Sequence, residues 1–547
     1  MTRSNTTMAE KYFRQPSTVT TQAHFAQIPA SQIERSKFDR SHGHKTTFDE
    51  GVLVPIFLDE VLPGDTFSID ATVFARLSTP LHPFMDNLYL DTHFFWVPNR
   101  LVWDNWVNFM GERVNPTDNP EDYSVPQIEI PLDRVTGVDM ASYFGIPYAQ
   151  GAAGSKISVN CLPFRAYHLI WNYWYRDENL QDSVIIPRGN GPDLYNEAYS
   201  VLKARNKRKD YLTSALPWPQ KGSPVYIPLG TSAPVLTDGN PVQFQVQGGV
   251  NRTLYAAAGT NNVGYTGQSL ATQATFFLTD RANYDAGVRT GMLADLQAAT
   301  AITINDLRTA FQVQKMLERD ARGGTRYKEL VLSHFGVNMP DAQWQPEYLG
   351  GSHSMINVSP IAATYSGADV STGDLGAVAT ALGKTHINKS FTEHGFVMGL
   401  ISVRSDLTYQ NGVERFWSRI TRYDYYFPTL AHLGEQAILN REVFVTGTAA
   451  DLGTWGFQER YAEYRYKPGR VTGFLSSNNA LSLDTWHLAQ DFTTLPPLSW
   501  LFLIDAPPIE RVVAVPGQQK FICDSWFRFT CDRPMPTYSF PGLVDHF

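Results

Sequence analysis

Few residues of this 547-residue chain have the types and spacing that chemistry requires. Residues 378–385 (VATALGKT) end like a phosphate-binding loop, but that motif begins with glycine and lies between an apolar strand and a helix, and neither condition is met here. His42 and His44 are close enough to share a metal ion, yet no further ligand lies nearby in the sequence. Cys523 and Cys531 lack the CxxC spacing, so we interpret them as packing thiols. The sequence therefore predicts a protein that is not an enzyme and that has no cofactor or metal site.

One basic run is the candidate binding site. Residues 203–210 (KARNKRKD) are the densest positive charge in the chain, and they either form a solvated helix end, where cations are favoured, or contact phosphates. Lysine and arginine number 45 against 53 acidic residues, for a net charge of -8, so any contact with nucleic acid must be local. The candidate nucleic-acid contacts are Lys203, Arg205, Lys207, Arg208 and Lys209.

Aromatic side chains offer a second possible contact. Residues 162–176 (LPFRAYHLIWNYWYR) have the pattern of an aromatic-rich helix, in which Trp171, Trp174 and Tyr175 could stack against bases. An aromatic stripe at a spacing of three and four residues more often packs into a core, and we favour that interpretation.

The elements that must position these residues are mainly strands. Residues 67–78 alternate apolar and polar side chains, as expected of a strand with one buried face. Residues 88–97 form a second candidate strand after a proline-bearing connection, and we expect the two to pair. Residues 521–530 alternate in the same way, and we expect them beside the first strand, so that the chain closes on itself as antiparallel sandwiches do. Residues 396–403 are apolar on both faces, which is typical of a central strand.

The composition favours a mainly β protein. Aromatic residues make up 13% of the chain, and 34 prolines with 40 glycines favour short strands and many turns. No linker-like tract divides the chain, so we predict one large domain with long insertions. Three cysteines are too few for a disulfide framework, and their odd number fits a reducing compartment. Because there is no signal-peptide pattern and no run of about 18 apolar residues, we expect no membrane insertion.

Three segments depart from the strand pattern. The first 50 residues are polar, and we predict an arm over residues 1 to about 60 that lies against a neighbouring subunit or lines the interior of an assembly. Residues 221–300 are rich in Gly, Ala, Thr, Gln and Asn, and they are too long for an ordinary loop, so we predict a surface insertion. Residues 303–321 have the pattern of a capped helix with an apolar stripe, which we expect to be buried around Phe311.

Blocks of sequence along most of the chain carry a resemblance to a known family. They are FFWVPNRLVW (94–103), SALPWPQKG (214–222), ERDARGGTRY (318–327), QPEYLGGS (345–352), SFTEHGFVMGL (390–400), LTYQNG (407–412), HLGEQAI (432–438), ERYAEYRYKPGR (459–470) and RPMPTYSFPGLVDHF (533–547). In these blocks the chain resembles the major capsid proteins of the Microviridae, which are small single-stranded DNA phages, and specifically those of the gokushovirus group. The region of about 221–300 has no counterpart in the resemblance.

The resemblance implies a fold. It is a single eight-stranded antiparallel jelly roll of the viral capsid type with long, partly helical insertions. On this chain it corresponds to an N-terminal arm over residues 1–60 and a first part of the jelly roll with helical insertions over 61–220. The surface insertion over 221–300 would form a protrusion at the threefold axes, and residues 301–547 would complete the jelly roll and the C-terminal segment.

The resemblance also implies a structural function. Sixty copies would assemble into a T=1 icosahedral shell around circular single-stranded DNA, in the virion, after assembly in the cytoplasm of the host bacterium. The expected partners are other copies of the chain, the DNA, a small basic DNA-binding protein and an internal scaffolding protein of the same virus, and a receptor on the bacterial surface. The alternative from a different class is a jelly-roll carbohydrate-binding or glycan-processing protein, because such clefts also use Trp, Tyr and carboxylates.

Overall fold

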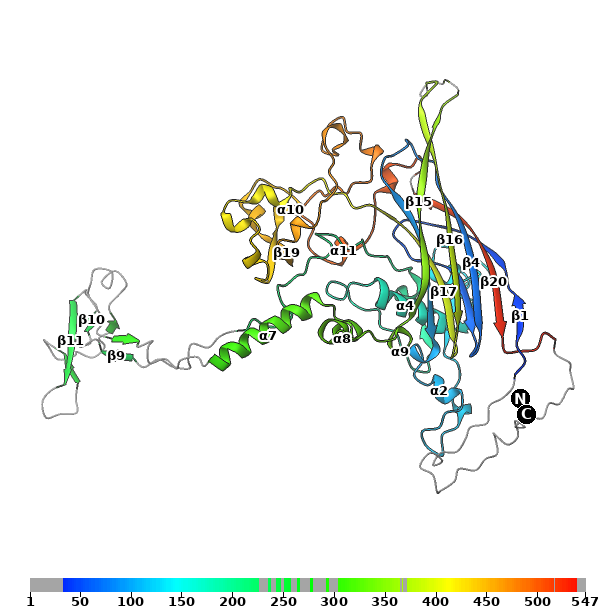
Figure 1. Ribbon diagram of the computed structural model, residues 1–547, viewed down its shortest axis with the longest axis horizontal. Helices are drawn as coiled ribbons and strands as arrows, with labels where there is room; N and C mark the ends of the chain where they lie inside the picture. The colour runs from blue at the N-terminus through cyan, green and yellow to red at the C-terminus, as the bar shows by residue number, and fades with distance from the viewer. Residues whose placement is uncertain are drawn as a thin grey trace, which may run out of the picture. The chain divides into compact units, whose positions relative to one another are not determined.

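The centre of the molecule is one curled antiparallel sheet, in which segments far apart in the sequence lie side by side (Figure 1). The computed structural model describes residues 33–225, 304–364, 366, 371–515 and 517–538, together with short strands between residues 235 and 294. In sheet order the strands are β1 (Ser36–Asp39), β20 (Phe521–Arg533), β4 (Thr66–Leu77), β16 (Leu375–Ser390), β15 (Glu347–Ala362), β5 (Leu88–Pro98), β17 (Gly395–Ser405) and β3 (Val54–Val61), and β2 (His42–Phe48) also pairs with β20.

Strand β15 joins the two halves of this sheet because it changes partner along its length. Residues 347–356 pair with β5, whereas residues 357–362 pair with β16. The inward faces of the two halves enclose one apolar cluster, which includes Phe67, Phe94 and Phe527. Two halves that pack face to face over a shared core give the sandwich that the strand pattern predicts and the jelly-roll type of architecture that the resemblance implies, with insertions in the connections.

The burial of each half depends on what covers its outer face. Strand β4 alternates between buried and more accessible positions, because the outer face of the β20–β4–β16 half is open and leaves Phe74 and Trp526 42% and 55% exposed. Strand β17 is buried along its whole length, since a second apolar cluster around helix α4 (Leu162–Ile170) covers the outer face of its half. The central strand predicted over residues 396–403 is therefore confirmed.

Of the two strand pairings predicted from the sequence, one is confirmed and one is wrong. Strand β20 lies beside β4, with Phe521 opposite Leu77 and Phe529 opposite Ile69. Strands β4 and β5 are not neighbours, because β16 and β15 lie between them. A short connection favours pairing, but here the long β15–β16 hairpin, which comes much later in the chain, pairs with both strands instead.

The interval predicted as an arm, residues 1–60, contributes strands to the sheet. Strands β1 and β2 pair with β20, and β3 pairs with β17. Phe48 and Phe57 from this interval are buried in the main core. The part of the arm before residue 33 lies outside the described residues. In the described part, the strands of the sheet thus begin well before residue 60.

Short helices and small sheets occupy the connections. The remaining strands outside residues 220–333 form a three-stranded sheet of β7 (Lys156–Asn160), β6 (Gln127–Pro131) and β8 (Asp193–Leu194) and a pair of β18 (Glu435–Leu439) and β19 (Thr454–Glu459). The short helices are α2 (Trp106–Phe109), α3 (Met140–Tyr143), α5 (Glu197–Ser200), α9 (Asp341–Trp344), α10 (Asn440–Val443) and α11 (Trp500–Leu503).

Residues Gln220–Ser333 form a compact unit of their own, which contains the predicted insertion over 221–300 and extends beyond it. Its strands make two small sheets, and its long helix α7 (Ile304–Arg322) confirms the helix predicted over 303–321. The elements are β9 (Val235–Thr237), β10 (Gln243–Val246), β11 (Val250–Ala256), β12 (Val263–Tyr265), β13 (Phe276–Leu278), β14 (Met292–Ala294), α7 and most of α8 (Tyr327–Phe335).

The first half of the apolar stripe of α7 is on the surface of the chain. Leu307 is 36% exposed and Phe311 is 62% exposed, whereas Ala321 near the end of the helix is buried. The prediction that Phe311 is buried is wrong, because an amphipathic pattern does not specify which surface meets the apolar stripe. Among the helices that the structure describes, none is both long enough and apolar enough to cross a membrane.

Candidate nucleic-acid interface

The basic run over residues 203–209 is an extended segment and not a helix end. The backbone N–H of Arg205 donates to the carbonyl oxygen of Gly51 at 2.7 Å, and that of Lys207 donates to the carbonyl oxygen of Leu503 at 2.8 Å. The segment therefore lies between the chain that leads into β3 and the end of α11. Because an extended backbone turns successive side chains to opposite sides, the five cations do not share one surface.

Arg205 belongs to a buried cluster of charges. Its Nη1 donates to Asp91 Oδ2 and to Ser402 Oγ, both at 2.8 Å, and its Nε lies 3.9 Å from Asp505 Oδ2. Arg404 Nε donates to the same Asp91 oxygen at 2.8 Å. Burial by itself would raise the pKa of Asp91, but the two guanidinium groups outweigh burial and lower it. Since Arg205 is 9% exposed and already paired, it ties the segment to β5 and β17.

Lys207 is also enclosed by its own chain. Its Nζ donates to the carbonyl oxygen of Phe502 at 2.6 Å and to Gln490 Oε1 at 2.8 Å, and it lies 4.4 Å from the centre of the Phe502 ring. Burial lowers the pKa of Lys207 to about 8, although the carboxylates of Asp505 and Asp210 oppose the shift. With 6% of the residue exposed, the ammonium group is not accessible to a phosphate in this structure.

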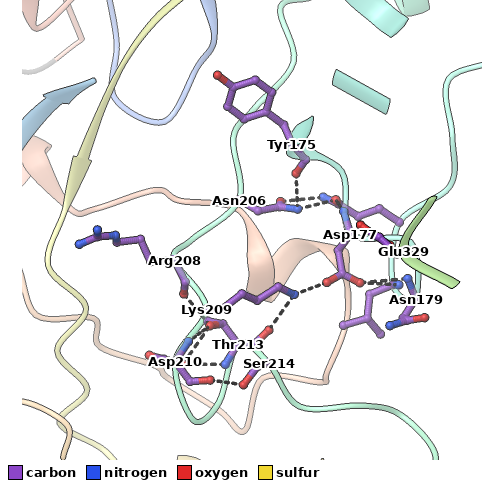
Figure 2. Close-up of polar contacts among 12 residues, drawn as sticks. Tyr175, Asp177, Asn179, Asn206, Arg208, Lys209, Asp210, Thr213, Ser214 and Glu329 are labelled. Carbon is purple, nitrogen blue, oxygen red and sulfur yellow. Dashed lines mark hydrogen bonds and ion pairs between the residues drawn. The ribbon is translucent and has the colours of Figure 1, made fainter. Parts of the chain in front are cut away.

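The other three candidate cations differ in exposure. Lys203 is half-buried, and burial lowers its pKa against the opposing charge of Glu197. Lys209 is exposed and paired with Asp177 (Figure 2). Arg208 is exposed, and its side chain points away from that pair (Figure 2). Arg208 and Lys209 are therefore the exposed side chains among the five predicted contacts.

Arg208 lines a cavity of about 500 Å³ that it shares with the long connection between β17 and β20. The rings of Phe416, Trp417 and Tyr466 and the guanidinium group of Arg470 line the same cavity. A cavity of this size can hold a ligand as large as a nucleotide.

Beside the cavity the surface carries a group of exposed rings, which we call the aromatic platform. The platform comes from residues 415–427 (RFWSRITRYDYYF) and 459–470 (ERYAEYRYKPGR). Its rings are between 39% and 69% exposed, and they are Phe416, Trp417, Tyr423, Tyr425, Tyr426, Phe427, Tyr464 and Tyr466.

Hydrogen bonds hold the two segments of the platform together. The backbone N–H of Tyr426 donates to Tyr464 Oη at 3.2 Å, while Tyr461 Oη and Arg460 Nη2 both donate to the carbonyl oxygen of Tyr423 at 3.3 Å. Tyr461 is buried with φ at +63°, a left-handed conformation that costs a non-glycine residue about 1–3 kcal/mol. The surrounding contacts therefore enforce the geometry of the platform.

The platform is not predicted from the sequence, in which residues 459–470 stand out only as a block of family resemblance. The available signal was composition, since the two segments together hold seven basic, nine aromatic and three acidic residues. That signal is ambiguous without a structure, because the aromatic residues of 162–176 are also dense.

The aromatic stripe over residues 162–176 packs within the chain. It forms α4 and the π-helical turn η3 (Trp171–Tyr175). Trp171 is buried and donates from Nε1 to the carbonyl oxygen of Ala204 at 2.9 Å, and Trp174 Nε1 donates to the carbonyl oxygen of Pro346 at 2.9 Å. The core interpretation is therefore confirmed for Trp171, whereas Tyr175 is half-buried and Trp174 is 37% exposed.

The residues that the sequence analysis rejected as candidates for chemistry lie in strands or in the core. Residues 378–385 lie within strand β16, and the ring of His42 on β2 packs 5.7 Å from that of Phe57. Cys523 and Cys531 are free and buried, and burial raises the pKa of each thiol to about 11, as expected of packing thiols. Over the described ranges, no three His, Cys, Asp or Glu side chains gather where they could hold a metal ion.

A curled jelly-roll sheet with long insertions is consistent with the class of shell-forming viral proteins, although lectins and cupins share the jelly roll. The family model for the capsid protein (F protein) matches residues 26–543, and the chain belongs to this family. It is 44% identical to capsid protein VP1 of Bdellovibrio phage phiMH2K, over 96% of this chain and 98% of that protein. It is 42% identical to capsid protein VP1 of Chlamydia phage 1 and 36% identical to that of Spiroplasma virus 4, in each case over 95% of this chain and 97% of the relative. The chain is therefore a structural protein of a phage virion.

Proposed function

We propose that sixty copies of this chain form a T=1 icosahedral shell that encloses circular single-stranded DNA. The observation that carries the proposal is the alignment of at least 95% of the chain with capsid proteins of three phages. The open outer face of the β20–β4–β16 half supports it, because exposed apolar side chains such as Phe74, Leu382 and Trp526 are available for contacts between copies.

The charge of the chain indicates what else the particle contains. Each copy has a net charge of -8, whereas enclosed phosphates require positive counter-charge. A small basic DNA-binding protein of the same virus, or bound cations, supplies most of that charge in our proposal, and an internal scaffolding protein assists assembly. The contacts of the shell protein with DNA are then local, with Arg208 and Lys209 at the exposed end of the basic segment.

The compact unit Gln220–Ser333 supports a separate role for the insertion over 221–300. We assign to it the protrusion at the threefold axes and attachment to a receptor on the host bacterium. Residues 221–300 of this unit have few charges, which leaves many Gly, Thr, Asn and Gln residues for adaptable hydrogen bonds with a glycan or protein.

Electron microscopy of the expressed protein tests the proposal. The chain should form uniform icosahedral particles, alone or with the internal scaffolding protein of the same virus. If the chain stays monomeric at all concentrations with and without that protein, and instead binds or cleaves oligosaccharides, the carbohydrate-directed alternative replaces the shell.

A further inference from the structure

We propose that the aromatic platform and the adjoining cavity bind single-stranded nucleic acid, with bases stacked on the exposed rings and phosphates contacted by the arginines between them. The inference rests on the proposed function, since it names the surface through which the shell protein contacts enclosed DNA. It concerns residues 415–427 and 459–470 and the nearby Arg208.

The local charge is the first observation. The two segments hold seven basic and three acidic residues in a chain whose net charge is negative. Arg208, Arg422 and Arg460 make no ion pair with a carboxylate among the described residues. An arginine without a carboxylate partner can bind a phosphate without first breaking an ion pair. Each such contact also releases counterions from the nucleic acid, which favours binding.

The placement of the arginines relative to the rings is the second observation. The guanidinium carbon of Arg422 lies 4.8 Å from the centre of the Tyr423 ring, and that of Arg419 lies 4.3 Å from the centre of the Tyr464 ring. A guanidinium group against a ring extends the flat surface on which a base can stack. Arg422 is exposed and has no carboxylate partner among the described residues, so it is available to phosphate oxygens, whereas Arg419 donates to Glu463 Oε1 at 3.4 Å and only supports the ring surface. Rings combined with cations in this way are the usual means of binding single strands without sequence preference.

The rigidity of the platform is the third observation. Arg415 Nη1 donates to the carbonyl oxygen of Ala437 at 2.7 Å and to Glu442 Oε1 at 2.6 Å, which fixes the start of the first segment. The backbone N–H groups of Thr421 and Ile420 donate to Asp424 Oδ2, and these hydrogen bonds lower the pKa of that carboxyl group. A surface held in place before binding loses little conformational freedom when a ligand arrives.

A neighbouring copy of the chain is the competing occupant of exposed rings. Two features favour nucleic acid. The cavity beside the platform has room for a nucleotide, and its wall carries the unpaired Arg208 together with aromatic rings and the ion pairs Arg415–Glu442 and Arg470–Glu414. Arg208, Arg422 and Arg460 also lack carboxylate partners among the described residues, unlike Arg415 and Arg419, and a strand of phosphates offers partners for these three at once.

The test uses the purified full chain, a fluorescent thymidine oligonucleotide and anisotropy titrations at several salt concentrations. Arg422→Gln should weaken binding about fivefold and reduce the slope of log affinity against log salt by about one, because one phosphate contact is lost. Tyr425→Ala should weaken binding about tenfold with the salt slope unchanged, because stacking is lost and charge is not. Matched controls are Arg113→Gln and Tyr148→Ala, which change exposed residues away from the platform and should bind as the wild type does.

A second measurement uses assembled particles. Ultraviolet cross-linking of DNA-filled particles, followed by mass spectrometry, should place cross-links on peptides from residues 415–427. Thermal melts of the variants should match the wild type, since the changed side chains are exposed.

The possible results distinguish a failure of the platform proposal from a failure of the shell proposal. Particles that form normally while both platform variants bind the oligonucleotide as tightly as the controls overturn the platform and leave the shell function intact. Variants that block particle formation without changing oligonucleotide affinity show that the platform is a contact between copies. A wild-type chain that binds the oligonucleotide through the platform but never forms particles overturns the shell proposal instead.

Discussion

Neighbouring cations of residues 203–209 have different roles because an extended segment turns them in different directions. Arg205 and Lys207 point into the chain, where Asp91 and the carbonyl oxygen of Phe502 bind them. Arg208 points outward and lines a cavity. A buried charge is tolerated only with its partners, so the inward cations determine stability while the outward one is free to meet a ligand.

Replacement of Arg205 should reveal this difference. Arg205→Leu leaves Asp91 with one guanidinium partner in a buried site, and we expect the free energy of unfolding to fall by about 3 kcal/mol or more. The matched control, Arg208→Leu, removes an exposed charge of the same segment and should change stability by less than about 0.5 kcal/mol. Urea denaturation followed by tryptophan fluorescence measures both, and equal effects of the two substitutions would contradict the buried cluster.

His168 on α4 makes stability depend on pH. It is fully buried against the Tyr199 ring, and burial, with the nearby charge of Lys203, lowers its pKa from 6.5 to about 3. The unfolded chain takes up the proton below pH 6.5 while the folded chain does not, so stability is lost as the pH falls through this range. At pH 5 the loss from this group is about 2 kcal/mol.

Denaturation at pH 7 and pH 5 checks the effect of His168. His168→Phe should remove this part of the acid sensitivity, whereas His386→Gln, which changes an exposed histidine, should retain it. If His168→Phe loses as much stability between the two pH values as the wild type does, the buried ring is not the group that titrates.

At the scale of elements, the burial pattern of each strand depends on whether one or both of its faces are covered by other parts of the chain. Strand β17 lies between the main core and the helical layer around α4, so it is apolar throughout. Strand β4 has one open face and alternates. The same reasoning applies to α7, whose exposed Phe311 should tolerate Phe311→Asp without loss of stability in the single chain.

Gly399 of β17 provides a test of packing at the centre of the sheet. A Cβ atom at this position would lie 2.7 Å from Phe94 Cε1 and 2.9 Å from Phe57 Cβ, so the two rings leave no room for a side chain. Gly399→Ala should therefore lower the free energy of unfolding by about 1–3 kcal/mol. Gly376→Ala on β16, where the nearest atom is 3.8 Å away, is the control, and thermal melts should show little change for it.

Removal of the first strands should impair assembly. A chain that starts at Gly51 lacks β1 and β2, so the edge of β20 and the Phe521 ring that packs on Phe48 become exposed. We expect the rest of the sheet to fold but the chain to aggregate or assemble poorly, as seen by sedimentation and electron microscopy. A chain that starts at residue 33 keeps both strands and is the control. Normal particles from the shorter chain would show that these strands are dispensable.

At the scale of the whole molecule, the chain folds into two compact units to which we have assigned different roles. The larger one contains the jelly roll, the basic segment and the aromatic platform, and the smaller one, Gln220–Ser333, contains the insertion. Separate compact units allow one surface to change without refolding the other. The contacts proposed for DNA and for the host therefore belong to different units of the chain.

Replacement of residues 221–300 by a short Gly-Ser linker tests this division. The shell should still form, because closing a connection with a flexible linker has a modest entropic cost. The resulting phage should fail to adsorb to its host, which a count of unadsorbed particles measures. If the shortened phage adsorbs as the wild type does, the receptor-binding surface lies elsewhere on the shell.

The sequence by itself determined the fold class and the family, because alternating apolar residues and long blocks of similar sequence are local properties of the chain. The β4–β20 pairing was predicted from the expected closure of an antiparallel sandwich, and the structure confirms it. It did not determine that β15 and β16 separate β4 from β5, or which residues among 203–209 are exposed. Those features depend on partners far away in the sequence, such as Asp91, Ser402 and Phe502. The aromatic platform required the tertiary structure for the same reason: the rings over residues 162–176, except Trp174, are largely covered by other parts of the chain, whereas rings over 415–427 are left exposed. Exposure results from what packs against a residue, and only the folded chain decides that.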